Sequence, residues 1–367
     1  MATNSNQRGK RMTAEQYKSK RRKKIIIFTI EIFVILLMLL GLYLVMNKTP
    51  EEGPIITVLE PSNLEISEEV KENESMKGYR NIALFGVDAS TSSQLYKNSR
   101  SDSIMIASIN MDTGDIKLVS VYRDTYLNVG TDTYIKCNHA YSYGGAEQAV
   151  KMLNMNLDLD ITDFVTVGYA GLSKVIDGLG GIYIDVDSEE LKHINNYQMD
   201  ISEKLKVKYN PVEQAGYQLL DGLQATAYCR IRYTSGDDFK RASRQREVIK
   251  ALEAKAKDTN LSTLTKVFNE ALPNIYTSID SKDIIELLGK IADYRIVEEG
   301  GFPDENMRTV TNVGSKGSSV VPLSLQDNVV WLHQFLFEDP DYQVSDSVKE
   351  YSSHIAADTN PYINRNN

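Results

Sequence analysis

The longest apolar stretch of the chain runs from Ile25 to Met46. It holds 22 residues with a single charge, Glu31. About 20 helical residues at a rise of 1.5 Å cross the hydrocarbon core of a bilayer, so the stretch predicts a transmembrane helix over residues 25–46. A cleaved signal peptide is the alternative. Its apolar core is usually about 7–15 residues long and ends at small residues, which the chain lacks at 45–50.

The segment that follows, residues 47–77, is polar and acidic. It contains three Pro and eight Glu against three Lys, and its few large apolar residues gather at 55–59. Such a self-repelling composition predicts an acidic extracellular stalk with one short strand. Residues 78–337 alternate short apolar runs with helical periodicity and predict one large domain. Residues 338–367 lose this periodicity and predict a flexible polar tail.

Three strands are predicted near the start of that domain. Residues 81–88 form a nearly continuous apolar run that ends in Asp88, the pattern of a strand buried on both faces. Residues 103–110 and 116–122 predict two further strands, and the Asp and Gly residues between them suit a tight turn. The two strands should therefore form a β-hairpin.

The register of this hairpin gathers charged residues at one end of the sheet. Counted outward from the turn, Arg100 and Asp102 fall near Arg123 and Asp124, because antiparallel partners lie side by side. Arg100 and Asp102 are two residues apart, so they share a face if the strand begins that early.

A second group of charges lies about a hundred residues further along the chain. Residues 227–233 read as a strand whose alternation places Tyr228, Arg230 and Arg232 on one face. Two guanidinium groups would then point in the same direction.

Residues 240–257 predict a helix with one continuous face. Positions three and four residues apart line that face, namely Arg241, Gln245, Val248, Ile249 and Leu252. The apolar part should pack on the sheet, while the first turn carries Arg241 and Gln245 inward. Free backbone N–H groups and the helix dipole favour an anion there. These patterns together predict an α/β fold of the α+β kind, with a central mixed, largely antiparallel sheet flanked by helices.

Charge sets the orientation of the predicted anchor. Residues 1–24 hold nine Lys or Arg and only one acidic residue, Glu15, whereas the rest of the chain has 32 basic and 49 acidic residues. Lys and Arg beside a spanning helix stay in the cytoplasm, so residues 1–24 should form a basic cytoplasmic tail and the domain should lie outside the cell. The prediction is a single-pass protein of the cell membrane with its domain outside. Two cysteines exclude a disulfide framework.

The candidate chemistry is that of an anion site. Five or six arginines converging in an acidic domain favour a polyanionic ligand such as pyrophosphate, because guanidinium forks bind phosphate oxygens in pairs. Asp88 and Asp102 would repel that ligand unless a cation lies between them, which points to Mg²⁺, with Mn²⁺ as a substitute. Each residue alone has a structural explanation, a solvated strand face or a turn cap. The functional interpretation depends on their combination.

The combination resembles the LytR-CpsA-Psr family. The likeness covers residues 80–255, extends more weakly to 337, and rests on seven blocks in order: Asn81 to Asp88, Arg100 to Ile106, Val119 to Tyr126, Asn138 to Gly145, Gly178 to Val186, Leu220 to Ala225, and Arg230 to Gln245. The resemblance implies an extracellular Mg-dependent phosphotransferase that moves a glycopolymer, of teichoic acid or capsule type, from a polyprenyl pyrophosphate carrier to peptidoglycan. It also implies an envelope of the Gram-positive type.

Roles for individual residues follow from the same resemblance. It implies that Asp88 and Asp102 hold the metal and that the catalytic set comprises Asp88, Asp102, Arg123 and Arg230. The residues implied to hold the pyrophosphate are Arg100, Arg123, Arg230, Arg232, Arg241 and Gln245. A muramic acid C6 hydroxyl would attack the sugar-proximal phosphorus. The general base stays open between Asp88, Asp102 and a metal-activated hydroxyl.

Two other functions remain open at this stage. A polyprenyl-pyrophosphate hydrolase would use the same residues with water as the nucleophile. A membrane-bound regulator of transcription or of the envelope would need a cytoplasmic effector, and residues 1–24 are too short for a DNA-binding domain. The expected partners are therefore the lipid-linked glycopolymer, peptidoglycan and membrane lipids, with no nucleic acid.

Overall fold

The computed structural model describes residues 55–96, 99–234 and 237–363. The predicted transmembrane helix at 25–46 and the basic tail at 1–24 lie outside these residues. Across the described ranges, no helix combines the length and the hydropathy needed to cross a bilayer.

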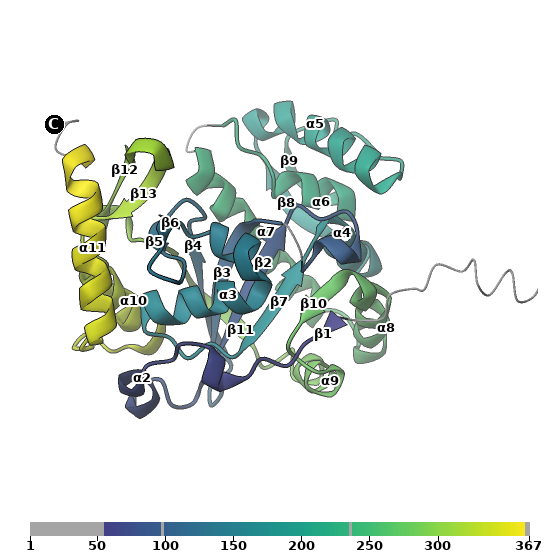
Figure 1. Ribbon diagram of the computed structural model, residues 1–367. Coiled ribbons are helices and arrows are strands. Elements are labelled where there is room, and N and C mark those ends of the chain that lie inside the picture. The colour runs from purple at the N-terminus through teal and green to yellow at the C-terminus, as the bar shows by residue number, and fades with distance from the viewer. Residues whose placement is uncertain (1–54, 97–98, 235–236, 364–367) are drawn as a thin grey trace, which may run out of the picture. The chain divides into compact units, whose positions relative to one another are not determined.

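A seven-stranded mixed sheet forms the centre of the fold (Figure 1). In spatial order its strands are β1 (Ile55–Ile56), β10 (Ile275–Thr277), β7 (Asp163–Val167), β2 (Tyr79–Val87), β3 (Ser101–Asn110), β4 (Asp115–Val121) and β11 (Arg295–Phe302). Three neighbouring pairs are parallel and three are antiparallel. The predicted mixed sheet is confirmed, but its predicted largely antiparallel character is wrong, since β1, β7 and β11 each join a neighbour in parallel.

Three two-stranded antiparallel sheets surround the central sheet in the described part of the chain. Their strands are β5 (Tyr126–Asn128) with β6 (Tyr134–Lys136), β8 (Ile182–Val186) with β9 (Gly216–Leu220), and β12 (Arg308–Asn312) with β13 (Ser318–Pro322).

The hairpin predicted from the sequence is present as β3 and β4. Met105 lies opposite Ser120 and Ile109 opposite Ile116, as an antiparallel register requires. Gly114 has φ of +75° in the connecting turn, a conformation that residues with a Cβ rarely adopt. The buried strand predicted at 81–88 is β2, which lies between β3 and β7.

Helices cover both faces of the sheet (Figure 1). Ile104 and Ile106 of β3 pack in the cluster that includes α3 (His139–Leu157), whereas Met105 and Ala107 face Ile249 of α7 (Asp237–Lys257). The remaining helices are α2 (Glu68–Glu72), α4 (Tyr169–Gly178), α5 (Ser188–Leu205), α6 (Gly222–Tyr228), α8 (Leu261–Ala271), α9 (Ser281–Gly289), α10 (Leu325–Phe337) and α11 (Asp346–Ile363). Short 3₁₀ turns occur at Pro61–Asn63, Ser92–Gln94, Leu272–Asn274, Glu305–Met307 and Gly314–Lys316.

A second apolar cluster joins α4, α5 and α6 to the antiparallel pair of strands β8 and β9. Capping boxes start two of these helices: Asp187 pairs reciprocally with Glu190 at α5, and Asp221 with Gln224 at α6. The predicted helix at 240–257 is confirmed as α7, which begins three residues earlier than predicted.

The strand predicted at 227–233 is wrong. The chain is helical through Tyr228 and then forms an irregular segment from Cys229 to Thr234. Tyr228 is buried and donates a hydrogen bond to Glu247, so it does not share a face with Arg230 and Arg232 as the prediction had it. The capping box at Asp221, with Gln224 three residues later, is the sequence signal for the helix.

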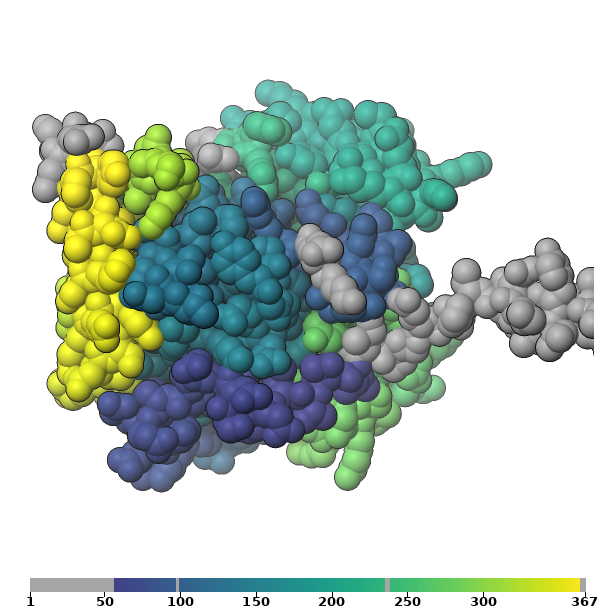
Figure 2. Space-filling model, in the orientation of Figure 1, coloured from purple at the N-terminus to yellow at the C-terminus, as the bar shows by residue number. Residues whose placement is uncertain are grey.

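Residues 55–77 do not form the predicted stalk. Leu59, Leu64, Val70 and Met76 are buried in the main apolar cluster. Strand β1 also adds to the edge of the central sheet beside β10, which agrees with the short strand predicted there. Figure 2 shows this segment, in purple, lying directly against the body of the domain. Burial of these four side chains makes the segment part of the fold.

The predicted flexible tail at 338–367 is also wrong over its described part. Helix α11 occupies most of it, and Val348 and Ile355 are buried in the main cluster together with Tyr342 and Val344. Within α11 the buried positions Val348, Ser352, Ile355 and Thr359 follow helical spacing, but two of them are polar, so the apolar pattern alone does not mark the helix.

Candidate functional site

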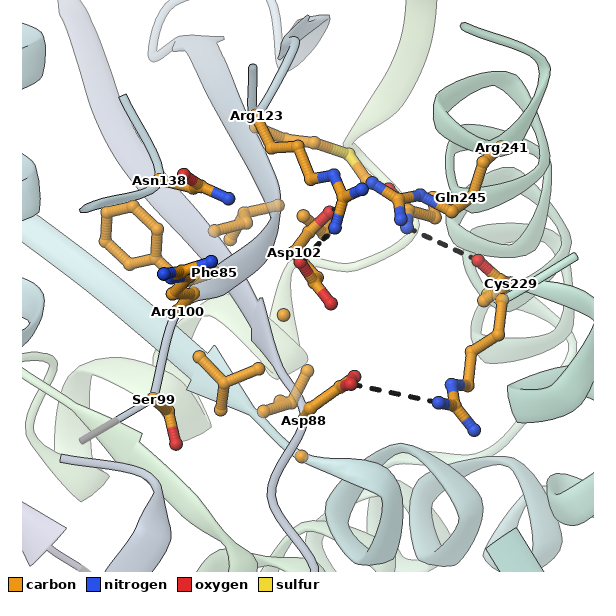
Figure 3. Close-up of a pocket in the computed structure, with 18 of the residues that line it drawn as sticks. Phe85, Asp88, Ser99, Arg100, Asp102, Arg123, Asn138, Cys229, Arg241 and Gln245 are labelled. Carbon is orange, nitrogen blue, oxygen red and sulfur yellow. Dashed lines mark hydrogen bonds and ion pairs between the residues drawn. The ribbon is translucent and has the colours of Figure 1, made fainter. Parts of the chain in front are cut away.

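A cavity of about 1270 Å³ lies between the α7 face of the central sheet and helices α4 to α7 (Figure 3). All eight side chains singled out from the sequence line this cavity: Asp88, Arg100, Asp102, Arg123, Arg230, Arg232, Arg241 and Gln245. The hairpin, the segment after α6 and the first two turns of α7 therefore deliver their charged residues to one place.

Arg123 and Asp102 form the ion pair that the hairpin register predicts. Arg123 Nη1 lies 2.5 Å from Asp102 Oδ1, and the second oxygen of Asp102 lies 3.7 Å from Arg232 Nη2. Burial disfavours the charge of Arg123, but Asp102 and Asp238 outweigh it and raise the pKa of Arg123. Asp102 thus joins the hairpin to the segment after α6.

Asp238, in the first turn of α7, faces three guanidinium groups. Its carboxylate lies 3.0 Å from Arg241 Nη2, 3.4 Å from Arg123 Nε and 4.0 Å from Arg232 Nε. A carboxylate held by three arginines occupies the kind of position in which a phosphate group would be bound.

Arg241 is the most deeply buried of these arginines, with a side chain that is 5% exposed. Its Nη2 donates to the backbone carbonyl of Asp102 at 2.9 Å. Burial lowers the pKa of Arg241 to about 10; Arg123 and Arg232 also lower it, while Asp238 opposes the shift. The side chain remains charged at neutral pH, but its positive charge is poorly compensated.

Two guanidinium nitrogens of this group are unsatisfied. Among the described residues, neither Arg123 Nε nor Arg241 Nε makes a hydrogen bond, although both atoms are buried. Asp238 lies 3.4 Å from Arg123 Nε as an ion-pair partner, without forming a hydrogen bond to it. A buried N–H group without a partner costs about 1–3 kcal/mol. An anion with several oxygens would supply the missing acceptors.

Arg230 belongs to a separate part of the cavity. Its Nη1 lies 2.5 Å from Asp200 of α5 and its Nη2 lies 3.8 Å from Asp88, the ion pair marked beside Asp88 in Figure 3. The guanidinium also stacks over the rings of Tyr169 and Tyr197, at 4.7 and 5.4 Å from their centroids. Burial disfavours its charge, but the hydrogen bond to Asp200 outweighs this and raises the pKa of Arg230.

Arg100 lies apart from these pairs. In Figure 3 it lies beside Phe85 and Asn138, across the cavity from Arg241 and Gln245. Arg100 is exposed and directly precedes β3, which begins at Ser101. Burial and the charge of Arg100 lower the pKa of His139, which also lines the cavity. The sequence thus predicted the residues that line the cavity but not their division into groups.

Gln245 contacts the chain rather than another charged side chain. Its side-chain nitrogen donates to the carbonyl of Cys229 at 3.4 Å, a long hydrogen bond, and so contacts the segment that carries Arg230 and Arg232 (Figure 3).

Lys136, Lys316, Asn138 and several aromatic side chains also line the cavity. A further part of its wall is aliphatic. Side chains of the central sheet, α4 and α7 form it: Leu84, Met105, Val165, Val167, Leu172, Val175, Val248, Ile249, Leu252 and Ile275. The apolar face predicted for α7 is therefore confirmed, and three of its residues contribute to this wall. A cavity with charged and aliphatic walls suits an amphiphilic ligand that has an anionic head and a hydrocarbon chain.

Sequence reasoning missed two carboxylates of the site. Asp238 precedes Arg241 by three residues, so the spacing of a helical ion pair was an available signal. Asp200 reaches Arg230 only because α5 packs on α6, and no local pattern marks that contact. With Asp88, Asp102 and Asp124, which also lines the cavity, these residues bring five carboxylates to the arginines.

Asp88 and Asp102 suit a hard cation but do not enclose one. Mg²⁺ is commonly held by one or two carboxylates together with substrate phosphates. Within the described ranges, no group of three or more His, Cys, Asp or Glu side chains is arranged to hold a metal ion. A cation bound here would need ligand oxygens from a phosphorylated substrate.

Comparison with known proteins gives consistent matches. A sequence model described as the LytR_cpsA_psr family matches residues 56–318. The polyisoprenyl-teichoic acid–peptidoglycan teichoic acid transferase TagT of Bacillus subtilis (strain 168) is 28% identical over 62% of this chain and 69% of its own length. The corresponding transferase TagU of Enterococcus faecalis (strain ATCC 700802 / V583) is 30% identical over 58% of this chain and 65% of its own length.

Solved structures share the fold. The structure "TagT bound to LI-WTA" superposes with a TM-score of 0.57 at 25% identity, over 76% of this chain and 97% of that one. The mixed sheet flanked by helices is thus common to both proteins.

Proposed function

The chain belongs to the LytR-CpsA-Psr family, and from this premise we propose that it transfers a glycopolymer from a polyprenyl pyrophosphate carrier to peptidoglycan. The names of the two related transferases support the class of reaction. The observation that carries the proposal is the cavity itself, in which arginines with unsatisfied Nε atoms share one space with an aliphatic wall.

The proposed binding mode follows the two kinds of wall. Arg123, Arg232 and Arg241 bind one part of the pyrophosphate, which displaces the Asp238 carboxylate or lies beside it. Arg230 binds another part. The polyprenyl chain lies along the aliphatic wall, where burial of each CH₂ contributes about 0.8 kcal/mol.

The proposed reaction is a displacement at the sugar-proximal phosphorus. The C6 hydroxyl oxygen of a muramic acid residue forms the new P–O bond, and the bond to the bridging oxygen breaks. Polyprenyl phosphate leaves, and the sugar phosphate remains attached to peptidoglycan as a phosphodiester. Arginines that surround the pyrophosphate stabilise the charge that develops on the leaving oxygen.

The hydroxyl proton needs an acceptor. Asp102 lies in close ion pairs with Arg123 and Arg232, whereas the Asp88 side chain is about half exposed and its pair with Arg230 is longer, at 3.8 Å. We therefore assign the base to Asp88 rather than Asp102, as part of the proposal.

Mg²⁺ is part of the proposal as a cofactor, with Mn²⁺ as a substitute. Asp88 and Asp102 would hold it together with phosphate oxygens, and the ion would neutralise charge on the pyrophosphate. Omission of divalent cations, with EDTA present, should abolish transfer, and re-addition of Mg²⁺ should restore it.

Location is likewise a proposal. The apolar run at 25–46 and the basic residues before it favour a single-pass membrane protein with its catalytic domain outside the cell. Protease added to intact protoplasts should then cleave the domain, whereas an internal domain would be protected.

The decisive experiment uses the full-length protein in detergent with Mg²⁺, a polyprenyl-pyrophosphate-linked saccharide and a peptidoglycan oligomer. Wild type should yield the phosphodiester-linked product, and Arg230→Ala should reduce the rate roughly 100-fold, as for loss of a group that stabilises the transition state. Equal rates would refute the assignment of the site. Release of free saccharide phosphate without transfer would identify a hydrolase instead.

A further inference from the structure

A second arginine of α7 points away from the cavity. Arg244 is 1% exposed and is the largest of the fully buried side chains. It lies three residues after Arg241, within the block Arg230 to Gln245 that the sequence analysis singled out, yet the proposed reaction does not use it.

Arg244 makes three hydrogen bonds, each with a different group. Its Nε donates to Glu190 Oε1 at 2.7 Å, its Nη1 to the carbonyl of Ile231 at 2.9 Å, and its Nη2 to Thr234 Oγ1 at 2.5 Å. Glu190 is itself 2% exposed, and its other carboxylate oxygen accepts from the backbone N–H of Asp187 at the start of α5. Two of the three bonds thus go to the segment between α6 and α7.

That segment, residues 229–234, is neither helix nor strand. Its own backbone bonds are local, such as Arg230 N–H to the Ala227 carbonyl at 3.0 Å and Thr234 N–H to the Arg232 carbonyl at 2.9 Å. No sheet register therefore fixes its course.

Along residues 229–232, the residues that α7 contacts alternate with the two arginines that line the cavity. Gln245 contacts the carbonyl of Cys229 and Arg244 that of Ile231, while Arg230 and Arg232 line the cavity. The Ile231 side chain is fully buried in the second apolar cluster. Residues 229 and 231 are thus anchored, and 230 and 232 are presented to the ligand.

We propose that Arg244 is a positioning residue: through its bonds to Ile231 and Thr234 it sets the backbone that presents Arg230 and Arg232 to the pyrophosphate. This inference rests on the proposed function. Replacing a buried ion pair by apolar side chains is often neutral for stability. The pair can therefore be removed while its effect on the position of the two arginines is measured separately.

The test compares Arg244→Met with the double variant Arg244→Met/Glu190→Met, both in the full-length protein. The single variant leaves Glu190 buried and unpaired, so its Tm should fall. The double variant should recover most of that Tm. Its affinity for inorganic pyrophosphate, measured by calorimetry, should nevertheless stay at least tenfold weaker than that of wild type. A double variant that binds like wild type would overturn the proposal.

Milder variants keep the test valid if Arg244→Met does not fold. Thr234→Val removes one bond to the segment and should weaken pyrophosphate binding severalfold with little change in Tm. Glu190→Gln leaves both bonds to the segment intact and should bind almost as wild type. Lys240→Met, an exposed change on the same helix, is the matched control and should behave as wild type. If Thr234→Val also binds as wild type, the proposal fails.

Steady-state kinetics distinguish a positioning role of Arg244 from a general loss of folded structure. In the transfer assay, Thr234→Val and Arg244→Lys should raise the KM for the lipid-linked saccharide more than they lower kcat. Wild type that binds pyrophosphate but transfers nothing would refute the proposed function and leave the binding test standing. Wild type that does not bind pyrophosphate would overturn both.

Discussion

Arg241 combines the deepest burial among the cavity arginines with an unsatisfied nitrogen. Its side chain is 5% exposed, against 17% for Arg123 and 34% for Arg232. The nearby carboxylates compensate its charge only in part, as its lowered pKa shows. A residue held in this state is set up to bind an incoming anion, because the anion removes both the unpaired donor and the uncompensated charge.

The variant Arg241→Lys tests this directly. Lysine keeps the charge but loses the planar fork that contacts Asp102 and Asp238, so pyrophosphate affinity should fall about tenfold or more. Calorimetric titration with inorganic pyrophosphate measures the loss. Lys240→Arg, on the exposed side of the same turn, serves as the control, and an unchanged affinity in Arg241→Lys would exclude Arg241 as a ligand.

At the scale of secondary-structure elements, α5 holds Arg230 through an ion pair with Asp200. Asp200 of α5 bonds to Arg230 at 2.5 Å and to Lys204 at 2.9 Å. Partial burial opposes the ionised form of Asp200, but its hydrogen bonds to Arg230 and Lys204 lower its pKa below 3.8. The ion pair therefore couples the docking of α5 to the charge of one carboxylate.

This coupling predicts a pH dependence of stability. A carboxylate whose folded-state pKa is lowered stabilises the protein above its unfolded pKa of 3.8, and this contribution is lost as pH falls through the folded-state value. Asp200→Asn should accordingly unfold more easily than wild type near pH 7. The two proteins should converge below pH 3.8 in urea titrations. A constant difference across this range would show that Asp200 acts without its charge.

Helix α11 contributes to the core rather than extending from it. Ile355 is 1% exposed and packs in the main cluster. Ile355→Ala should therefore reduce the free energy of unfolding by about 2–5 kcal/mol. Lys349→Ala on the exposed face should change it by less than about 0.5 kcal/mol. Chemical denaturation measures both, and a negligible effect at Ile355 would restore the flexible tail predicted from the sequence.

The sequence predicted those parts of the site that depend on local register. The β3–β4 hairpin brings Asp102 to Arg123 because a tight turn fixes which residues lie opposite each other. The strand predicted at 227–233 was wrong. Alternation of Tyr228, Arg230 and Arg232 indicates a strand, but the capping box at Asp221 starts a helix that continues to Tyr228. Arg230 and Arg232 still reach the cavity, and Arg244 of α7 donates to the carbonyl of Ile231, which lies between them.

Contacts between distant elements were not predictable in this way. Asp200 meets Arg230 only after α5 packs on α6, and Leu59 or Ile355 looks like an isolated apolar residue until the main cluster surrounds it. Single apolar positions spaced within polar sequence carry little signal, because exposed apolar residues are common. For this reason the predictions of a stalk before residue 78 and of a flexible tail after residue 337 were wrong.

At the scale of the whole molecule, the cavity combines a cluster of charged side chains with an aliphatic wall. Side chains of α4, the central sheet and α7 form that wall. An amphiphilic ligand should therefore gain affinity from both parts. The charged contribution should weaken as salt screens it, whereas the apolar contribution should not.

Leu172→Ala separates the two contributions. Leu172 lies in the aliphatic wall, so the variant should bind a long prenyl pyrophosphate severalfold more weakly and inorganic pyrophosphate as wild type does. Lys174→Ala, exposed on the same helix, is the control. Competition binding with prenyl pyrophosphates of increasing length gives the comparison, and an equal loss for both ligands would place the hydrocarbon elsewhere.

The main apolar cluster unites Leu59 and Leu64 with Val348 and Ile355, nearly 300 residues later in the chain. A core built from segments so far apart in the chain depends on contacts of long sequence separation, which form late and slow folding. The main cluster therefore stays incomplete until residues 348–355 have been synthesised.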